Sequence, residues 1–332
     1  MKRIFIMAGM AIALTPLMSQ PAFAWGHQGH ETVGAIAALL IHGSNAEKQV
    51  QKILPAGESL SDAAEWADCA KGFSYCHVEP TAEMKDFVAH NPQHHAYHFS
   101  DIPFQTKAYP ADGAVGVSSD DVVHILRDAI LVLQGKPASN PNHKLSQREA
   151  LYILAHMTGD IHQPLHVGAA YISSDNQFDV PKDQTDAKNS FTEGGNLMCK
   201  GSKNVHALWD DDLVVGAMRK AKVATTDALA SALLSKAKLF AGDKGAVGSW
   251  PDKWATESLQ LSSVELATIE VQRKRPSGAG QATCGTSDPQ SKTSVWDVQL
   301  PDKYLEDGAD TAANQLARAG ARLAKTLTAI WP

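Results

Sequence analysis

Apolar residues recur at helical spacing along most of this 332-residue chain, whereas the alternation typical of strands is scarce. In residues 146–162, for example, Leu151 and Leu154 fall on one helical face, and Pro164 then ends the pattern. Helices are expected at residues 28–42, 46–54, 120–133, 146–162, 205–218, 226–240, 253–269 and 302–330, with a break or kink near Gly308 in the last. The pattern predicts a mostly α-helical fold with little β structure.

The connections between these helices are long and polar in two places, residues 173–193 and 273–293. Loops of this length usually lie on the surface and often border a site. The chain contains no internal repeat and no clear linker, so we expect residues 25–332 to form a single domain with long surface loops.

The first 24 residues have the composition of a secretory signal peptide. Two basic residues precede an apolar stretch, and Ala22 and Ala24 form an A-x-A cleavage site that would make Trp25 the mature N-terminus. An uncleaved anchor helix is the alternative, but the stretch is short for a membrane span of ~20 residues and Pro16 interrupts it. Because no later stretch is apolar enough to cross a bilayer, we expect an exported protein without a membrane anchor, either periplasmic or secreted.

The charge balance is acidic. Loss of Lys2 and Arg3 with the leader leaves 36 acidic residues against 28 basic ones, a net charge of −8 with the histidines neutral. This balance gives no sign of a basic track for duplex DNA. Local positive charge would have to attract any phosphate substrate, and nothing in the sequence implies a protein partner.

Four cysteines, Cys69, Cys76, Cys199 and Cys284, are an even number in a chain with an export signal. Two disulfides are therefore expected, since an oxidising compartment lets them persist. Thiolate ligation of zinc is the alternative, but the chain contains no C-x-x-C pair. Among the three possible connectivities we favour Cys69–Cys76 with Cys199–Cys284.

The densest group of potential ligands is "HMTGDIHQPLHVG", residues 156–168. His156 and Asp160 are four residues apart, so on a helix they project from the same face. His166 follows Pro164, which ends that helix, so its side chain can fold back towards the same place. Two imidazoles and a carboxylate are ligand types that zinc prefers, although a single helical histidine is more often a hydrogen-bonded structural residue.

A second His-x3-Asp pair, His206 and Asp210, occurs in "NVHALWDDD", residues 204–212. One such pair can be a histidine and an acid on a solvated face. Two in one chain, each in an apolar context, favour a shared metal-binding role.

Two further segments supply isolated candidates. In "EWADCAKG", residues 65–72, Asp68 lies among small and apolar residues, where a carboxylate needs a partner to offset its desolvation. In "HAYHFSDIP", residues 95–103, His98 lies between two aromatic residues. His94 and His95 fall in a polar stretch, and we expect both to be solvated.

These segments together closely resemble the zinc-dependent single-strand nucleases and 3′-nucleotidases of the mung bean nuclease type, a family related to bacterial zinc-dependent phospholipase C. The resemblance rests on "WGHQGH", "WAD", "YHFSDIP", "HMTGDIHQPLH", "GGN", "NVHALWD" and, near the C-terminus, "AGARLAKTL". It implies a phospholipase C/nuclease-like helical fold. It also implies an endonuclease that hydrolyses single-stranded DNA and RNA to 5′-phosphorylated products and has 3′-nucleotidase activity.

The resemblance implies three Zn²⁺ ions and nine protein ligands, beginning with the free amine and carbonyl oxygen of an N-terminal tryptophan. By this analogy the ligands form three groups: Asp68 with His98, His156 and Asp160; Trp25 with His30 on a second ion, which Asp68 bridges to the first; and His166, His206 and Asp210 on a third ion.

The chemistry implied is phosphodiester hydrolysis. Zinc lowers the pKa of a bound water from ~15.7 towards 7, and the resulting hydroxide attacks phosphorus and leaves a free 3′-OH. Asp68 is the expected catalytic carboxylate at the metals. Lys71 matches a basic position near the phosphate and is assigned stabilisation of transition-state charge; a solvated lysine in a turn is the alternative.

The resemblance also supplies a base-binding site. Phe99, Asp101 and Asn196 match positions that stack on and hydrogen-bond one nucleobase, and Gly194 and Gly195 let the backbone pass close to that base. Stacking on an aromatic side chain tolerates any base and needs an unstacked one, which explains a preference for single strands. Phe99 as an ordinary core residue is the alternative.

Two other functions remain open at this point. A phospholipase C would use the same metals, but its final ligand pair typically ends in glutamate, where this chain has Asp210, and it would lack the base-binding residues. A non-catalytic zinc-binding protein would leave Phe99, Asp101 and Asn196 without a role.

Overall fold

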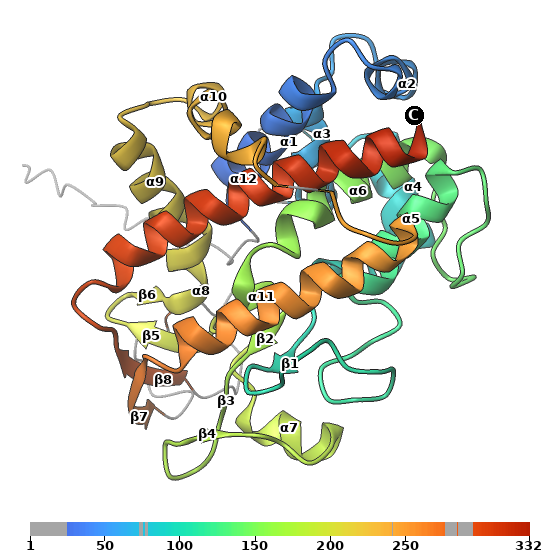
Figure 1. Ribbon diagram of the computed structural model, residues 1–332. Helices are drawn as coiled ribbons and strands as arrows, with labels where there is room; N and C mark the ends of the chain where they lie inside the picture. The colour runs from blue at the N-terminus through green and yellow to red at the C-terminus, as the bar shows by residue number, and fades with distance from the viewer. Residues whose placement is uncertain (1–24, 73–75, 77–78, 241, 276–283, 285–294) are drawn as a thin grey trace, which may run out of the picture.

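The computed structural model describes residues 25–72, 76, 79–240, 242–275, 284 and 295–332, and helices dominate it (Figure 1). The α-helices are α1 (His27–Ile41), α2 (Asn45–Ile53), α3 (Leu60–Ala70), α4 (Ala82–His90), α5 (Val122–Leu133), α6 (Gln147–Asp160), α7 (Gln184–Ser190), α8 (Val205–Ala207), α9 (Leu213–Ala221), α10 (Thr226–Ala237), α11 (Trp250–Leu266) and α12 (Tyr304–Ile330). Short 3₁₀ segments are η2 (His94–His98), η3 (Pro164–His166) and η5 (Val247–Ser249), and η4 (Leu208–Asp212) is a π turn. The mostly α-helical prediction is confirmed.

Helix α6 lies at the centre of the molecule, and every residue from 150 to 160 is buried. The helix begins at a capping box, in which the Ser146 side chain accepts from the Glu149 N–H and the Glu149 carboxylate accepts from the Ser146 N–H. Helices α1, α3, α5 and α12 all pack against it. A helix enclosed in this way holds its side chains in fixed positions, which suits a site built on it.

Helix α12 crosses the front of the molecule in Figure 1 and packs on α1, α9 and α6. The expected break near Gly308 is wrong, because α12 runs without interruption from Tyr304 to Ile330. Gly308 instead allows close packing: a Cβ at this position would lie 2.9 Å from Cδ1 of Leu213 in α9.

The strands form three small sheets. They are β1 (Ile102–Pro103), β2 (Gly168–Ala169), β3 (Tyr171–Ile172), β4 (Phe178–Asp179), β5 (Met198–Lys200), β6 (Lys203–Asn204), β7 (Glu270–Arg275) and β8 (Val295–Gln299). β1 and β2 are parallel, with Ile102 opposite Gly168, and β3 and β4 are antiparallel. The third sheet has the order β6-β5-β8-β7, in which only β5 and β8 are parallel. The β1–β2 pair holds the segment after His98 beside the segment after His166.

Three of the observed α-helices, α3, α4 and α7, are missing from the sequence prediction. Helix α3 does have a capping box, formed by Ser59 and Asp62, but its small residues gave weak periodicity. Helix α7 and β4 lie within residues 173–193, which we expected to be a loop; Asp183 caps α7 by accepting from two backbone N–H groups. The predicted helix at 205–218 exists as α8 and α9 with the π turn η4 between them.

The predicted disulfides are present, Cys69–Cys76 and Cys199–Cys284. In residues 273–293, the first three belong to β7 and Cys284 is in its disulfide; the others lie outside the described residues, as does the predicted leader. Of the helices in the described part of the chain, none is long and apolar enough to cross a membrane.

Candidate metal centre

Three groups of buried side chains in the core could each hold a metal ion. The groups are His30 with His156 and Asp160, Asp68 with His98 and His156, and His166 with His206 and Asp210. Each member is at most 6% exposed. All eight histidine and aspartate ligands expected from the sequence therefore fall in these groups, although they come from seven separate elements, α1, α3, η2, α6, η3, α8 and η4.

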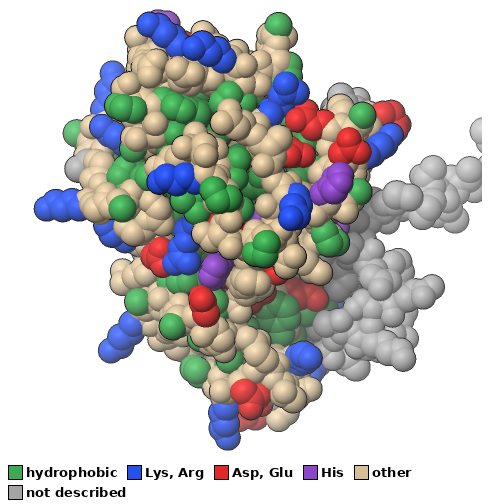
Figure 2. Space-filling view, turned by 90° about the vertical axis from the view of Figure 1, so that its right-hand side faces the viewer, with side chains coloured by type: hydrophobic (Ala, Val, Ile, Leu, Met, Phe, Trp, Pro, Cys, Tyr) green, Lys and Arg blue, Asp and Glu red, His purple; other side chains and the backbone are tan. Residues whose placement is uncertain are grey.

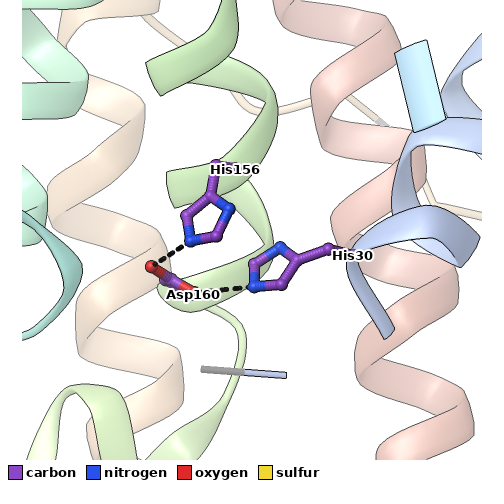
Figure 3. Close-up of side chains that lie close together, drawn as sticks. All are labelled: His30, His156 and Asp160. Atoms are coloured by element: carbon purple, nitrogen blue, oxygen red, sulfur yellow. Dashed lines mark ion pairs between the residues drawn. The ribbon is translucent and has the colours of Figure 1, made fainter. Parts of the chain in front are cut away.

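Asp160 lies between the first two groups. Its Oδ1 is 3.2 Å from His30 Nε2, and its Oδ2 is 3.0 Å from His98 Nδ1 and 3.3 Å from His156 Nε2. Figure 3 shows Asp160 and His156 projecting from α6 towards His30 on α1. A carboxylate with one oxygen towards each group is placed to bridge two ions.

The resemblance gives the bridging role to Asp68, and the contacts measured for Asp68 lie at the second group. Its Oδ1 is 3.6 Å from both His98 Nδ1 and His156 Nε2, so its measured contacts are with the second group. Asp68 lies on α3, which packs against both α1 and α6, and His30 reaches the centre from α1.

Backbone carbonyls fix the orientation of three of the imidazoles. Nδ1 donates to a carbonyl oxygen in His156 (Ala64, 2.6 Å), His166 (His98, 2.7 Å) and His206 (Gly194, 2.8 Å). Each Nε2 is then left with its lone pair directed into the group. Metal-binding histidines usually donate the N–H of their other ring nitrogen to a carbonyl or carboxylate in this way, and that hydrogen bond fixes the tautomer.

The third group is built across the π turn η4. His206 lies in α8 and Asp210 in η4, and their Nε2 and Oδ2 atoms are 3.5 Å apart. The His166 and His206 Nε2 atoms face each other at 3.0 Å. Gln163 Nε2 donates to Asp210 Oδ1 at 2.8 Å and leaves Oδ2 towards the group. π turns often occur at functional sites.

The donor set fits a cation. His30 Nδ1 and Asp210 Oδ2 are buried without a hydrogen-bond partner among the described residues, and His30 Nε2 and Asp160 Oδ1 have only their 3.2 Å contact with each other, which is costly unless something else binds them. Burial lowers the pKa of His98 and of His206 to about 3, so both imidazoles are neutral, the form that binds metal. Burial, with Asp211 adding to it, raises the pKa of Asp210 well above its usual range, and a nearby cation would oppose that shift.

Trp25 lies at the first group. Both Trp25 and His30 lie against Gly159 of α6. A Cβ built on Gly159 would be 2.8 Å from His30 Nδ1 and 3.8 Å from Trp25 Cδ1. The next residue is tied to the third group, because the Gly26 N–H donates to the Asp210 carbonyl at 2.9 Å. Trp25 and Gly26 are thus packed between the first and third groups.

A cavity of about 360 Å³ opens beside the second and third groups. Its lining consists of Lys71, His98, Phe99, Asp101, Leu165, His166, Phe191, Glu193, Gly194, Asn196 and His206. Lys71 is not a solvated lysine: its side chain is 13% exposed, and Nζ donates to Asp68 Oδ1 at 3.2 Å. Phe99 is not a core residue, because 38% of it is exposed.

Of the other residues expected at the base, Asp101, Gly194 and Asn196 line this cavity, and Gly195 is next to them in the chain. Gly194 and Gly195 both have positive φ (58° and 93°), and a Cβ on Gly194 would lie 2.7 Å from the Leu165 carbonyl. Burial, with Glu193 adding to it, raises the pKa of Asp101 to about 7. The cavity therefore combines an accessible aromatic ring, hydrogen-bonding groups and the edge of the metal groups.

Sequence reasoning missed two residues here and misjudged a third. Gln163, which orients Asp210, lies inside the "HMTGDIHQPLH" motif, and Glu193, which lines the cavity, directly precedes "GGN"; the spacing of neither residue predicts its role. His94 was expected to be solvated, but it is 4% exposed and stacks on Phe87 with ring centroids 5.9 Å apart. His95 is exposed, as expected.

Basic side chains are scattered over the face shown in Figure 2, with acidic side chains among them. They form no continuous track on this face. Among the described residues that line the cavity, Lys71 is the one that carries a positive charge.

Comparisons with known proteins agree with this geometry. A family model described as S1/P1 nuclease matches residues 25–332, beginning at Trp25. The chain is 26% identical over 312 residues to Endonuclease 2 of Arabidopsis thaliana, covering 92% of this chain and 90% of the relative. It is 23% identical over 320 residues to Nuclease S1 of Aspergillus oryzae, covering 96% of each chain. It is also 26% identical over 341 residues to Endonuclease 3 of Arabidopsis thaliana, covering 96% of this chain and 93% of the relative.

Proposed function

The chain belongs to the S1/P1 nuclease family, and from that premise we propose that it is an exported, zinc-dependent phosphodiesterase for single-stranded DNA and RNA. It cuts to 5′-phosphorylated products and also removes the phosphate of 3′-nucleotides. The observation that carries the proposal is a set of three buried His/Asp groups, two of which border one cavity that also exposes an aromatic ring.

Three zinc ions would be held by nine residues. In the proposal, Trp25 and His30 would hold one ion, Asp68, His98 and His156 would hold the next, and Asp160, which lies between these two groups, would be a ligand available to both. His166, His206 and Asp210 would hold the third ion. The nitrogen-and-carboxylate donor set suits zinc. Zinc there would supply charge neutralisation for the phosphate and a lower pKa for a coordinated water.

The remaining residues position the substrate. Lys71 is held near the second group by Asp68, where its ammonium neutralises a phosphate oxygen as charge develops in the transition state. Phe99 stacks on the base of the nucleotide that carries the leaving 3′ oxygen, and Asp101 and Asn196 hydrogen-bond its edge. A base can reach Phe99 only when it is free of its neighbours, which accounts for the preference for single strands.

Export is part of the same proposal. The leader would be cut before Trp25, and the two disulfides suit an oxidising compartment, periplasmic or extracellular. Cleavage there would free the Trp25 amine beside His30. A displaced cut would remove that ligand.

A substrate panel tests the proposal. The purified mature protein should hydrolyse single-stranded DNA, RNA and 3′-mononucleotides, release products with 5′-phosphate and 3′-hydroxyl ends, and leave a choline phospholipid intact. Hydrolysis of the phospholipid alone would assign the chain to phospholipase chemistry. Metal binding without hydrolysis of any substrate would leave a non-catalytic zinc-binding protein.

A further inference from the structure

Polar side chains in the cavity, other than Lys71 and the histidines of the metal groups, are hydrogen-bond acceptors. Asp101 and Glu193 contribute carboxyl groups and Asn196 an amide. Asn196 Nδ2 already donates to the Glu193 carbonyl at 2.9 Å, while its Oδ1 is buried with no hydrogen-bond partner among the described residues. The remaining side chains of the lining, Phe99, Leu165 and Phe191, are apolar. A base that enters would therefore meet acceptors.

Glu193 is held at the cavity by an unusual backbone conformation. Its φ is +52°, in the left-handed region, and it is followed by two glycines that also have positive φ. The turn is closed by Gly195 N–H and Leu197 N–H, which both donate to the Thr192 carbonyl. Non-glycine residues in this region are usually Asn or Asp, whose short side chains hydrogen-bond locally. Among the described residues, the Glu193 side chain forms no such local hydrogen bond. We therefore connect the choice of glutamate at this position with the cavity, which it lines, and not with the stability of the turn.

When ionised, carboxylates accept hydrogen bonds and cannot donate them. Asp101, whose pKa is about 7, is in this form above neutral pH. Among the nucleobases, guanine presents three adjacent N–H donors on its Watson–Crick edge, one on N1 and two on N2. Adenine and cytosine place one amino group beside an acceptor nitrogen. Uracil and thymine offer a single N3–H between two carbonyl oxygens, which carboxylates repel. The acceptor set of this cavity is therefore complementary to guanine.

We infer that the cavity selects guanine at the nucleotide whose 3′ oxygen leaves, with Glu193 and Asp101 together accepting from N1–H and N2–H₂. The inference rests on the proposed function and deepens it, because it assigns a base preference and a specificity residue, Glu193. Metal-ligand residues take no part in the choice of base.

The test compares kcat/KM for the four 3′-ribonucleotides. A well-placed pair of hydrogen bonds to a base edge discriminates by an amount that corresponds to about tenfold. We expect 3′-GMP to exceed 3′-UMP by about that factor, and Glu193→Gln to bring the ratio close to one, because the amide replaces an acceptor by a donor. Asp175→Asn is the matched control: it removes an exposed acid from the same segment, but Asp175 does not line the cavity, so the ratio should not change.

Binding of the 5′-nucleotide products, measured as Kd by calorimetry, gives the same comparison without turnover, and 5′-GMP should bind most tightly. Equal kcat/KM and equal Kd for all four bases would overturn the base preference while leaving the nuclease intact. An equal loss on every base in Glu193→Gln would overturn the role of Glu193. Absence of hydrolysis and of nucleotide binding would instead contradict the proposed function itself.

Discussion

Replacement of Asp160 by Asn should lower the amount of bound zinc per chain more than replacement of Asp68 by Asn. Asp160 faces two groups, with Oδ1 3.2 Å from His30 Nε2 and Oδ2 3.0 Å from His98 Nδ1. Asp68 Oδ1 lies 3.6 Å from His98 Nδ1 and from His156 Nε2, which places it at the second group. Asp160→Asn therefore removes a ligand from two ions, and Asp68→Asn removes one from a single ion.

The size of the effect follows from this count. Each ion has few protein ligands, so the loss of one carboxylate should lower its occupancy strongly. We expect bound zinc to fall from about three ions per chain to about two in Asp68→Asn and to about one in Asp160→Asn. Hydrolysis should be abolished in both variants, because both substitutions disrupt the pair of neighbouring ions.

The assay is zinc analysis by mass spectrometry after gel filtration in metal-free buffer, with thermal unfolding to check the fold. Asp128→Asn is the control: this carboxylate is also buried and lies 2.7 Å from a histidine nitrogen, His143 Nδ1, but it belongs to none of the three groups. It should lower stability and keep all the zinc. Equal losses from Asp68→Asn and Asp160→Asn, or a larger loss from Asp68→Asn, would refute the bridging position of Asp160.

Three further predictions follow from the site. Phe99→Ala should weaken nucleotide binding by ~1–3 kcal/mol, measured as Kd, and should affect hydrolysis of a phosphodiester without a base much less; equal losses on both would place Phe99 in support of the metal site. Expression of residues 25–332 behind a retained methionine converts the Trp25 amine into an amide without a free lone pair, so the protein should lose about one zinc ion and most of its activity. An aminopeptidase should restore both, and full activity without that treatment would contradict the role of Trp25. The Asp101 carboxyl, with a pKa of about 7, is protonated below that pH and ionised above it, so the ratio of kcat/KM for 3′-GMP over 3′-AMP should rise as pH passes through 7. A flat ratio would exclude Asp101 from the choice of base.

The local parts of the site could be predicted from the sequence. His156 and Asp160 are one helical turn apart, and the capping box and Pro164 fix the helix on which they lie, so their 3.3 Å contact follows from sequence alone. For the disulfides, the sequence allows three connectivities, and the favoured one is the one observed. The set of ligand residues came from the family resemblance, whose order of motifs is highly specific.

Other parts depend on packing, which spacing does not encode. Which carboxylate lies between the groups is decided by the approach of α1 to α6, where His30 stacks on His156 with ring centroids 3.8 Å apart. The π turn at Asp210 adds one residue to a helix whose apolar periodicity looks continuous. Glu193 lies at the cavity in a backbone conformation with positive φ. In the sequence, the two glycines that follow it, Gly194 and Gly195, are the one sign of such a turn. His94 is buried because α4 supplies Phe87 above it, and α4 itself was not predicted.

The most direct test of the account measures zinc content and cleavage of single-stranded DNA on the same preparation of the mature protein. The protein is first stripped with a chelator and then titrated with zinc. The account predicts that the stripped protein is folded but inactive, that activity returns as zinc approaches about three ions per chain, and that every product end carries a 5′-phosphate. Undiminished cleavage by the stripped protein, or saturation of activity at a single ion, would contradict it.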